Sequence, residues 1–247
     1  MNLEEFPEAL KKDIEDQSLA ILETIKDDII VIGGWAVRAL IGEKHARYTL
    51  DIDGISAEDN LIKLKKELEN AGLESRHSEW GTQFYQKYKP IIKIVDSEMF
   101  EKISKIELRI ELSKPKIREF QTHHYFEFSL TDFITKNIAF HNKNSTITIR
   151  VPPLESMTAV KLGLPVDYKN NFDSAVLLQI SDINKVIAAI KNNNDWFEIV
   201  LRRIPKSIGR IKDPGRLENM LLLNTGINIK DHIKKLEYIK TELKKHY

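Results

Sequence analysis

The sequence predicts an α+β (α/β) fold, with a central mixed β-sheet flanked by helices and followed by a helical C-terminal domain. Up to residue 152, short apolar or alternating segments, which are typical of strands, lie between amphipathic helical segments. After Pro153, segments of helical periodicity follow one another and are separated by Pro, Gly or Asn. We therefore expect two domains, over residues 1–152 and 153–247.

The expected elements follow from the period of the apolar residues. In the first domain they are a helix over 3–26, a strand over 29–34 ending in two glycines, a helix over 35–42, a strand over 48–55, a helix over 57–71, and strands near 73–79, 82–89, 105–113, 124–130 and 145–152. In the second domain they are helices over 154–164, 171–180, 183–191, 195–204, 214–223 and 231–245.

The composition limits the chemistry that the chain can perform. Of the 247 residues, 42% are apolar, which is enough for a sizeable core. The absence of cysteine excludes disulfides, thiolate-bound metals and a thiol nucleophile. The charged N-terminus lacks the apolar core of a signal peptide, and no apolar run approaches the roughly 18 residues of a membrane span. We expect a cytoplasmic protein with no membrane partner.

Positive charge is concentrated at the C-terminal end. The net charge of +1 provides no overall field, but residues 183–247 hold 14 Lys or Arg against 7 Asp or Glu. Such a cluster favours contact with RNA phosphates, although a solvated helical surface is its commonest role. The cations that form the densest part of it are Arg202, Arg203, Lys206, Arg210, Lys212 and Arg216.

Asp51 and Asp53 are the strongest candidates for metal ligands. They lie two residues apart in an alternating segment, so both side chains point to the same face of the expected strand. Two carboxylates held that close favour a hard divalent cation such as Mg²⁺ or Mn²⁺. Taken alone, the pattern is more often a solvated strand face.

Gly33 and Gly34 join an apolar strand to a helix. The first peptide groups of a helix present N–H donors and a positive dipole end, and the missing side chains let a polyphosphate approach the backbone. A glycine pair by itself is usually only a tight turn. Its occurrence shortly before the carboxylate pair favours a triphosphate cradle, and with it phosphoryl-type chemistry.

The two motifs carry a resemblance. GGWAV, from Gly33 to Val37, followed by R-x-T-x-D-x-D, from Arg47 to Asp53, resembles the DNA polymerase β-like nucleotidyltransferase superfamily, and within it the AbiEii-type toxins and the antibiotic nucleotidyltransferases. The resemblance implies a nucleotidyltransferase fold whose catalytic domain is the first one, and metal-dependent transfer of NMP from an NTP such as ATP to a hydroxyl acceptor. It also implies the residue roles: Gly33 and Gly34 bind nucleotide, and Asp51 and Asp53 bind metal and are catalytic. We expect Arg47 and Thr49 to bind nucleotide as well, with orientation of Asp51 or Asp53 as the alternative role of Arg47.

The same resemblance implies a third catalytic, metal-binding carboxylate on a later strand. RIELS, with Glu111 at its centre, is similar to the corresponding strand of AbiEii-type proteins, so Glu111 is the first choice. Strand periodicity places Glu107, Arg109 and Glu111 on one face and therefore admits Glu107 as the fallback. Asp96 is a further candidate.

Two residues of the helical half complete the expected site. The segment 151–163 is similar to a family segment whose helix supplies a triphosphate-binding lysine, here Lys161; without the resemblance, a lysine at a helix edge is the more common reading. In the following stretch Lys169 and Asn170 stand where the family has arginine and an acid. Asp173 is retained, either as general base for the acceptor or as a surface partner of Lys169.

Several readings of the function stay open. The basic C-terminal end slightly favours RNA, such as a tRNA 3′ end, over a small-molecule acceptor, and toxin-type relatives imply a cognate antitoxin. The glutamate at the third carboxylate position and Asn170 are compatible with a non-catalytic member that binds nucleotide or RNA. Trp35 could stack on a base or fill the core, and core filling is favoured.

Overall fold

The computed structural model describes residues 6–42, 47–78, 81–91, 97–118, 124–193 and 196–245. They form two compact units, and each is described by itself. The first contains the described residues of Met1–Ala39, Arg47–Pro115 and Phe133–Val151; the second contains those of Leu40–Ala46, Lys116–Asp132 and Pro152–Tyr247. A domain boundary between 152 and 153 stays a prediction, because the second unit also includes a segment from earlier in the chain.

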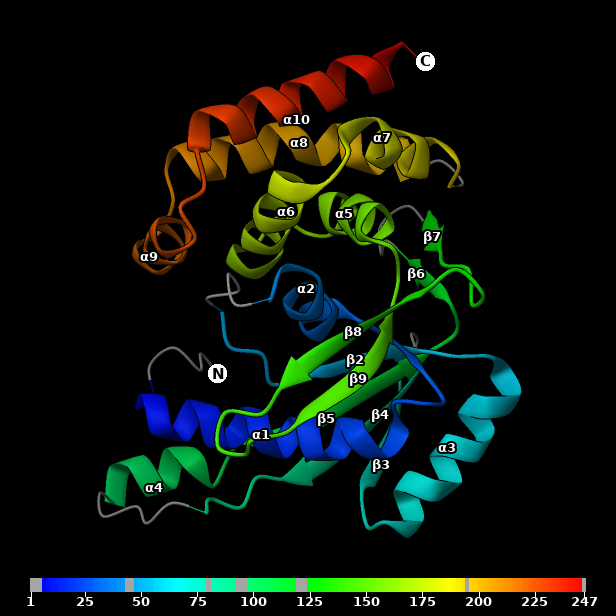
Figure 1. Cartoon of the computed structure of the whole chain (residues 1–247), viewed down its shortest axis with the longest axis vertical. Coiled ribbons are helices and arrows are strands. Elements are labelled where there is room, and N and C mark those ends of the chain that lie inside the picture. The colour runs from blue at the N-terminus through cyan, green and yellow to red at the C-terminus, as the bar shows by residue number, and fades with distance from the viewer. Residues whose placement is uncertain are drawn as a thin grey trace. The chain divides into compact units, whose positions relative to one another are not determined.

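The first unit combines a sheet with helices, which confirms the predicted mixed α/β class (Figure 1). Its elements are α1 (Glu8–Ile25), β1 (Ile30–Ile32), α2 (Gly33–Ile41), β2 (Ile52–Ile55), α3 (Glu58–Asn70), β3 (Glu74–Ser78), β4 (Gly81–Lys87), α4 (Ser97–Ile103), β5 (Glu107–Ser113), β8 (Ile134–Ala139) and β9 (Thr146–Val151). The sequence did not predict α4 or β8.

A five-stranded mixed sheet with the order β1-β2-β5-β4-β3 forms the centre of this unit. β2 and β5 run parallel, whereas the other neighbouring strands are antiparallel. The fold class predicted a central mixed sheet, and this prediction is confirmed. β8 and β9 form a separate hairpin, and β9 contacts β1.

The two faces of the sheet differ in character. Ile52, Phe84 and Ile110 alternate onto one face and are fully buried. Near the beginning of β5, Leu108 joins a buried cluster with Leu10 of α1. The opposite face carries polar side chains from β2, β5 and β4, and this polar face is where the predicted metal ligands lie.

β2 is shorter than the sequence predicted. Alternation suggested a strand from Tyr48, but the strand begins at Ile52 and Asp51 directly precedes it. Backbone groups of residues 49 and 50 make hydrogen bonds with side chains of α1 instead of with a neighbouring strand. The backbone N–H of Thr49 donates to a carboxylate oxygen of Glu15, and Ser18 Oγ donates to the carbonyl of Leu50, 3.2 Å away.

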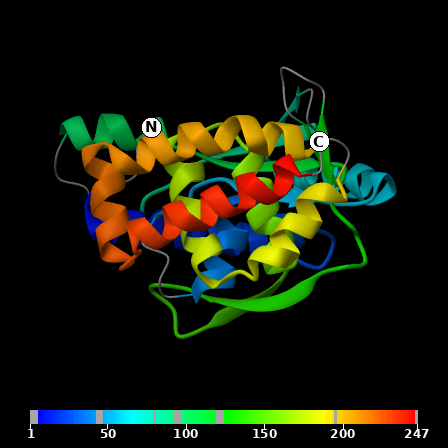
Figure 2. The ribbon, with the colours of Figure 1, turned by 90° about the horizontal axis from the view of Figure 1, so that it is seen from above.

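The second unit contains the hairpin of β6 (Lys116–Arg118) and β7 (Tyr125–Glu127) and a helical assembly. Its helices are α5 (Leu154–Gly163), α6 (Tyr168–Ile180), α7 (Ile183–Lys191), α8 (Trp196–Lys212), α9 (Arg216–Asn224) and α10 (Ile229–Lys244), and α8 and α10 lie side by side (Figure 2). α8 continues through Pro205, where the predicted helix ended, because Ile208 and Ile211 prolong its buried stripe. Among the described residues, none of the helices combines the length and apolarity needed to cross a membrane.

Candidate functional site

Three of the predicted carboxylates share the polar face of the sheet. Asp53 of β2 is the direct partner of Glu111 in the parallel register with β5, so their Cα atoms are roughly 5 Å apart. Asp51 lies two residues before Asp53 on the same side. The structure therefore brings Asp51 and Asp53, two of the predicted metal ligands, together with Glu111, the first choice for the third.

Arg109 of β5 joins this group. Its Nε donates to Asp51 Oδ1 at 3.1 Å and its Nη2 to Asp51 Oδ2 at 2.7 Å, a bidentate ion pair with side chains that are 40% and 27% exposed. Burial opposes its charge, but the hydrogen bond to Asp51 and the negative charges of Asp51, Asp53 and Glu111 together raise the pKa of Arg109. One cation thus interacts with all three carboxylates.

The alternative third carboxylates lie elsewhere. Glu107 is four residues before Glu111, which is roughly 13 Å along a strand, and its partner on β4 is Lys87. Asp96 falls outside the described residues. Of the candidates that the structure describes, only Glu111 is in register with Asp53.

The glycine turn packs directly on these residues. Gly33 has φ +67°, in the left-handed region, and a Cβ placed there would lie 1.9 Å from Asp53 Oδ2. A Cβ on Gly34 would lie 2.4 Å from Thr49 Oγ1 and 3.0 Å from Arg47 Nη2. Both glycines are therefore required for the close approach of the turn to the segment that carries the carboxylates.

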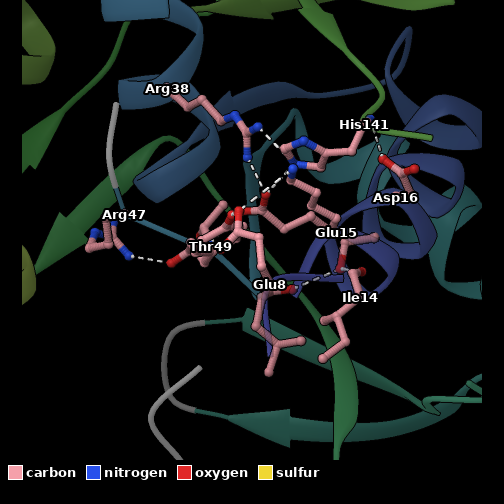
Figure 3. A network of polar contacts seen from close by, with 12 residues as sticks. Glu8, Ile14, Glu15, Asp16, Arg38, Arg47, Thr49 and His141 are labelled. Carbon is pink, nitrogen blue, oxygen red and sulfur yellow. Dashed lines mark hydrogen bonds and ion pairs between the residues drawn. The ribbon is translucent and has the colours of Figure 1, made fainter. Parts of the chain in front are cut away.

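Figure 3 shows a buried carboxylate, that of Glu15, in contact with Arg38, His141 and Thr49. Glu15 of α1 is fully buried; its Oε2 lies 2.5 Å from Arg38 Nη1 and 2.6 Å from His141 Nε2, and its Oε1 accepts from the N–H of Thr49 at 2.8 Å. Although burial opposes ionisation, the contacts with His141 and Arg38 and the Thr49 N–H lower the pKa of Glu15. The network ties α1 to the helix that follows the glycine turn and to the segment before Asp51.

Sequence reasoning missed the Glu15 network, although one signal for it exists. Glu15 lies four and seven residues before Leu19 and Leu22, which places an acid within the apolar stripe of an amphipathic helix. A buried acid requires a charged partner, but the sequence does not identify Arg38 or His141, which lie 23 and 126 residues further along the chain.

Lys161 and Asp173 lie in the second unit and pair with each other. Lys161 Nζ is 2.9 Å from Asp173 Oδ2 and donates to Asn170 Oδ1 at 3.3 Å, and the Lys161 and Asp173 side chains are 7% and 0% exposed. Lys169 instead lies over the ring of Tyr168. The roles of Lys161 in triphosphate binding and of Asp173 as a base stay predictions.

Trp35, directly after the glycine pair, is completely buried, with the Arg38 guanidinium 5.3 Å from its ring. It fills the core behind the turn, as favoured from the sequence.

The carboxylates of Asp51, Asp53 and Glu111 do not converge on one point as the ligands of a metal ion would. Among the residues that the structure describes, no three His, Asp or Glu side chains converge in that way. Asp51 is held by Arg109, and Gln83 Nε2 donates to Glu111 Oε2 at 2.9 Å. All three groups nevertheless offer the carboxylate oxygens that Mg²⁺ and Mn²⁺ prefer, so the residues fit such a cation.

Comparisons with known proteins concern the fold. No protein-family model matches the chain, and no characterised protein matches it in sequence. The crystal structure of JHP933 from Helicobacter pylori matches with a TM-score of 0.50 at 13% identity, covering 98% of this chain and 96% of that chain. At this identity, the likeness shows a common fold.

Two further solved structures are similar with TM-scores under 0.5. The lincomycin-bound lincosamide antibiotic adenylyltransferase LnuA has a TM-score of 0.43 at 18% identity, covering 68% of this chain and 97% of that chain. MenT4, a nucleotidyltransferase toxin from Mycobacterium tuberculosis H37Rv, has a TM-score of 0.45 at 11% identity, covering 95% and 92%.

Proposed function

We propose that the protein is a metal-dependent nucleotidyltransferase that transfers NMP from an NTP to a hydroxyl acceptor. One observation carries the proposal: Asp53 and Glu111 are register partners, and Asp51 is ion-paired with Arg109 of the same strand as Glu111, beside a glycine turn that begins a helix. Clustered carboxylates next to an anion-binding turn are the two parts that transfer of a phosphoryl-type group requires.

The metal is assigned to the carboxylates. Asp51, Asp53 and Glu111 would hold Mg²⁺ or Mn²⁺ through oxygen ligands, with Arg109 moving away from Asp51. When bound, such a cation polarises the phosphate and stabilises the charge that develops on the attacking and leaving oxygens.

The nucleotide triphosphate is assigned to the turn. Gly33 and Gly34 open α2, whose first N–H groups have no partner within the helix and can donate to phosphate oxygens. Thr49 and the Arg47 guanidinium lie against Gly34, within reach of the same anion. We propose that these four residues bind the triphosphate.

The reaction exchanges a phosphoanhydride bond for a phosphodiester bond. The acceptor oxygen forms a bond to the α-phosphorus, the bond from that phosphorus to the β-phosphate bridging oxygen breaks, and pyrophosphate leaves with that electron pair. The hydroxyl proton passes to a carboxylate base. The turn would hold the pyrophosphate portion, and the carboxylates would hold the cation that offsets the negative charge of the phosphates.

For the acceptor, we favour RNA, such as a tRNA 3′ end. The cations Arg202, Lys206, Lys212 and Arg216 are exposed on α8 and α9, which supports contact with phosphates. A cognate antitoxin is the further partner that we propose, because the motifs resemble those of toxin-type relatives.

A small-molecule acceptor is supported by a different feature. A cavity of about 300 Å³ in the first unit is lined by Glu74, Tyr85 and Lys87 among others, which gives it the acidic and aromatic walls that suit a polar small molecule. LnuA, described as a lincosamide adenylyltransferase, was solved with such a molecule bound.

The alternative to an enzyme is a non-catalytic protein that binds nucleotide or RNA. The bidentate ion pair of Arg109 with Asp51 favours it, because a cation of the protein already occupies one metal ligand. Asn170 of α6 also favours the non-catalytic alternative. Its Nδ2 donates to Oδ2 of Asp167, the N-cap residue of the helix, whereas an acid at this position could accept a proton in the reaction.

Labelled NTPs, Mg²⁺ and either total RNA or a library of hydroxylated small molecules test the proposal. We expect label transfer from wild type and none from the Asp51→Asn, Asp53→Asn double variant. The class of labelled product identifies the acceptor. If wild type binds NTP but transfers no label to either acceptor class, the non-catalytic alternative is correct.

A further inference from the structure

Gln83 and Tyr85 of β4 lie beside the carboxylates but were not among the predicted site residues. Gln83 is the direct antiparallel partner of Glu111, and its Nε2 donates to Glu111 Oε2 at 2.9 Å. The hydroxyl of Tyr85, two residues along the same face, donates to Gln83 Oε1. Both ends of the amide are therefore engaged.

This pairing fixes which end of the amide meets the carboxylate. A glutamine side chain has an acceptor at one end and donors at the other. Because Tyr85 donates to the acceptor end, the donor end must face Glu111. On the neighbouring strand, Arg76 is the register partner of Gln83, and its guanidinium lies over the Tyr85 ring, 4.4 Å from the centroid. The chain of contacts therefore runs from β3 to β5.

We infer that Gln83 is a positioning residue that orients Glu111 as a metal ligand, and that Tyr85 orients Gln83. The inference rests on the proposed function, since it concerns the third carboxylate of the same site. The hydrogen bond from Gln83 to Oε2 restrains the carboxylate of Glu111, whose register partner on β2 is Asp53. Partners of this kind fix metal ligands and typically change metal affinity about 10- to 100-fold.

A glutamate needs such a partner more than an aspartate does. Its side chain has one more rotatable bond, so an unrestrained carboxylate samples more positions. Glu107 is two alternations away from Glu111 on the same face, and its register partner is Lys87, an exposed residue. The contacts of Gln83 and Tyr85 therefore distinguish Glu111 from the other glutamate of β5.

Gln83 and Tyr85 are only partly buried, so their replacement opens no cavity in the core. This property makes the inference testable in folded variants. Gln83→Leu removes the donor while keeping the size of the side chain, and Tyr85→Phe removes the hydroxyl while keeping the ring under Arg76. Gln86→Leu is the matched control, because Gln86 is exposed on the same strand and alternates to the other face.

The test measures how tightly each variant binds Mn²⁺ in the absence of NTP. Electron paramagnetic resonance detects the free ion, and thermal unfolding checks that each variant is folded. We expect Gln83→Leu to weaken Mn²⁺ binding roughly tenfold or more. Tyr85→Phe should weaken it less, in the same direction, and Gln86→Leu should match wild type. In turnover, Gln83→Leu should raise the Mg²⁺ concentration needed for half-maximal rate and leave the KM for NTP unchanged.

A double variant separates the two ways in which this account can fail. If Asp51→Asn with Asp53→Asn abolishes Mn²⁺ binding while folded Gln83→Leu and Tyr85→Phe bind as wild type does, the positioning role is wrong and the metal site stands. If wild type binds no Mn²⁺, or the double variant binds it equally well, both the metal site and the positioning role are wrong.

Discussion

The guanidinium of Arg109 offsets a repulsion that would otherwise act among Asp51, Asp53 and Glu111. Like charges this close disfavour one another, so an uncompensated cluster would tend to move apart. The bidentate contact with Asp51 keeps the group compact. Under the proposed function, a divalent cation takes over this compensation when it binds, so Arg109 affects how tightly the metal is held.

Gly33 provides a prediction at the same scale. Gly33→Ala adds a methyl group that would overlap the Asp53 carboxylate, in a backbone conformation that side chains rarely adopt. We expect this variant to unfold about 2 kcal/mol more easily than Gly42→Ala and to lose NTP binding. Urea denaturation and titration with a nonhydrolysable NTP measure the two effects.

Gly42→Ala is the control for that comparison, because Gly42 has φ +63° but, among the residues that the structure describes, no atom lies within 4 Å of the added Cβ. It therefore carries the backbone cost alone, about 1–2 kcal/mol. Equal stability of the two variants, with NTP binding retained in both, would mean that the turn does not need its close approach to Asp53.

At the scale of elements, α1 does more than cover the sheet. Its buried Glu15 joins α2, the segment before β2 and the turn that contains His141. Asp16, the next residue, accepts from the N–H groups of His141 and Asn142 at 2.7 and 2.8 Å. Two adjacent acids of one helix thus fix the elements that carry the glycine turn and the carboxylates.

Glu15→Gln should therefore destabilise the protein strongly. The amide keeps the shape of the side chain but leaves the charge of Arg38 uncompensated in a largely buried setting, at a cost of about 3–5 kcal/mol. Glu23→Gln, at an exposed position of the same helix, should change the free energy of unfolding by less than about 0.5 kcal/mol. Urea denaturation of the two variants makes the comparison, and similar values for both would refute the role of the network.

α10 carries a buried histidine that makes stability depend on pH. Burial, with a smaller effect of Lys235, lowers the pKa of His232 to about 4 from its usual value of 6.5. The unfolded chain therefore binds a proton that the folded chain rejects, so stability is lost as pH falls from about 6.5 to about 4. The loss amounts to about 3 kcal/mol.

His232→Phe lacks this proton uptake and should show a correspondingly flatter dependence of unfolding free energy on pH. Urea denaturation between pH 7.5 and 4 measures both proteins. Parallel curves for the variant and wild type would show that His232 takes up its proton equally well in the folded state.

At the scale of the whole molecule, the parts that sequence predicted are those with strong local patterns. The strand before Gly33, the glycine turn and the long helices follow from period and punctuation. β8 was missed because its residues are mostly exposed and lack alternation in burial. The continuation of α8 through Pro205 was missed because its packing, rather than local preference, decides where it ends.

The candidate site divides in the same way. Spacing predicted that Asp51 and Asp53 share one side, because that depends on neighbouring residues only. The pairing of Asp53 with Glu111 and the ion pair of Arg109 with Asp51 depend on the register of two strands that lie 58 residues apart, which the sequence of one chain does not specify. For the same reason, local sequence patterns do not predict long-range polar contacts such as the hydrogen bond from Gln83 to Glu111.

The central claim is that Asp51, Asp53 and Glu111 support metal-dependent nucleotidyl transfer. Its most direct test is pyrophosphate release coupled to label transfer from NTP with Mg²⁺, compared between wild type, Asp53→Asn, Glu111→Gln and Glu107→Gln. We predict that Asp53→Asn and Glu111→Gln lose about 100-fold or more in kcat, as expected for loss of a metal ligand, while Glu107→Gln keeps most of it. Full activity in Asp53→Asn, or a loss in Glu107→Gln with Glu111→Gln unaffected, would contradict the claim.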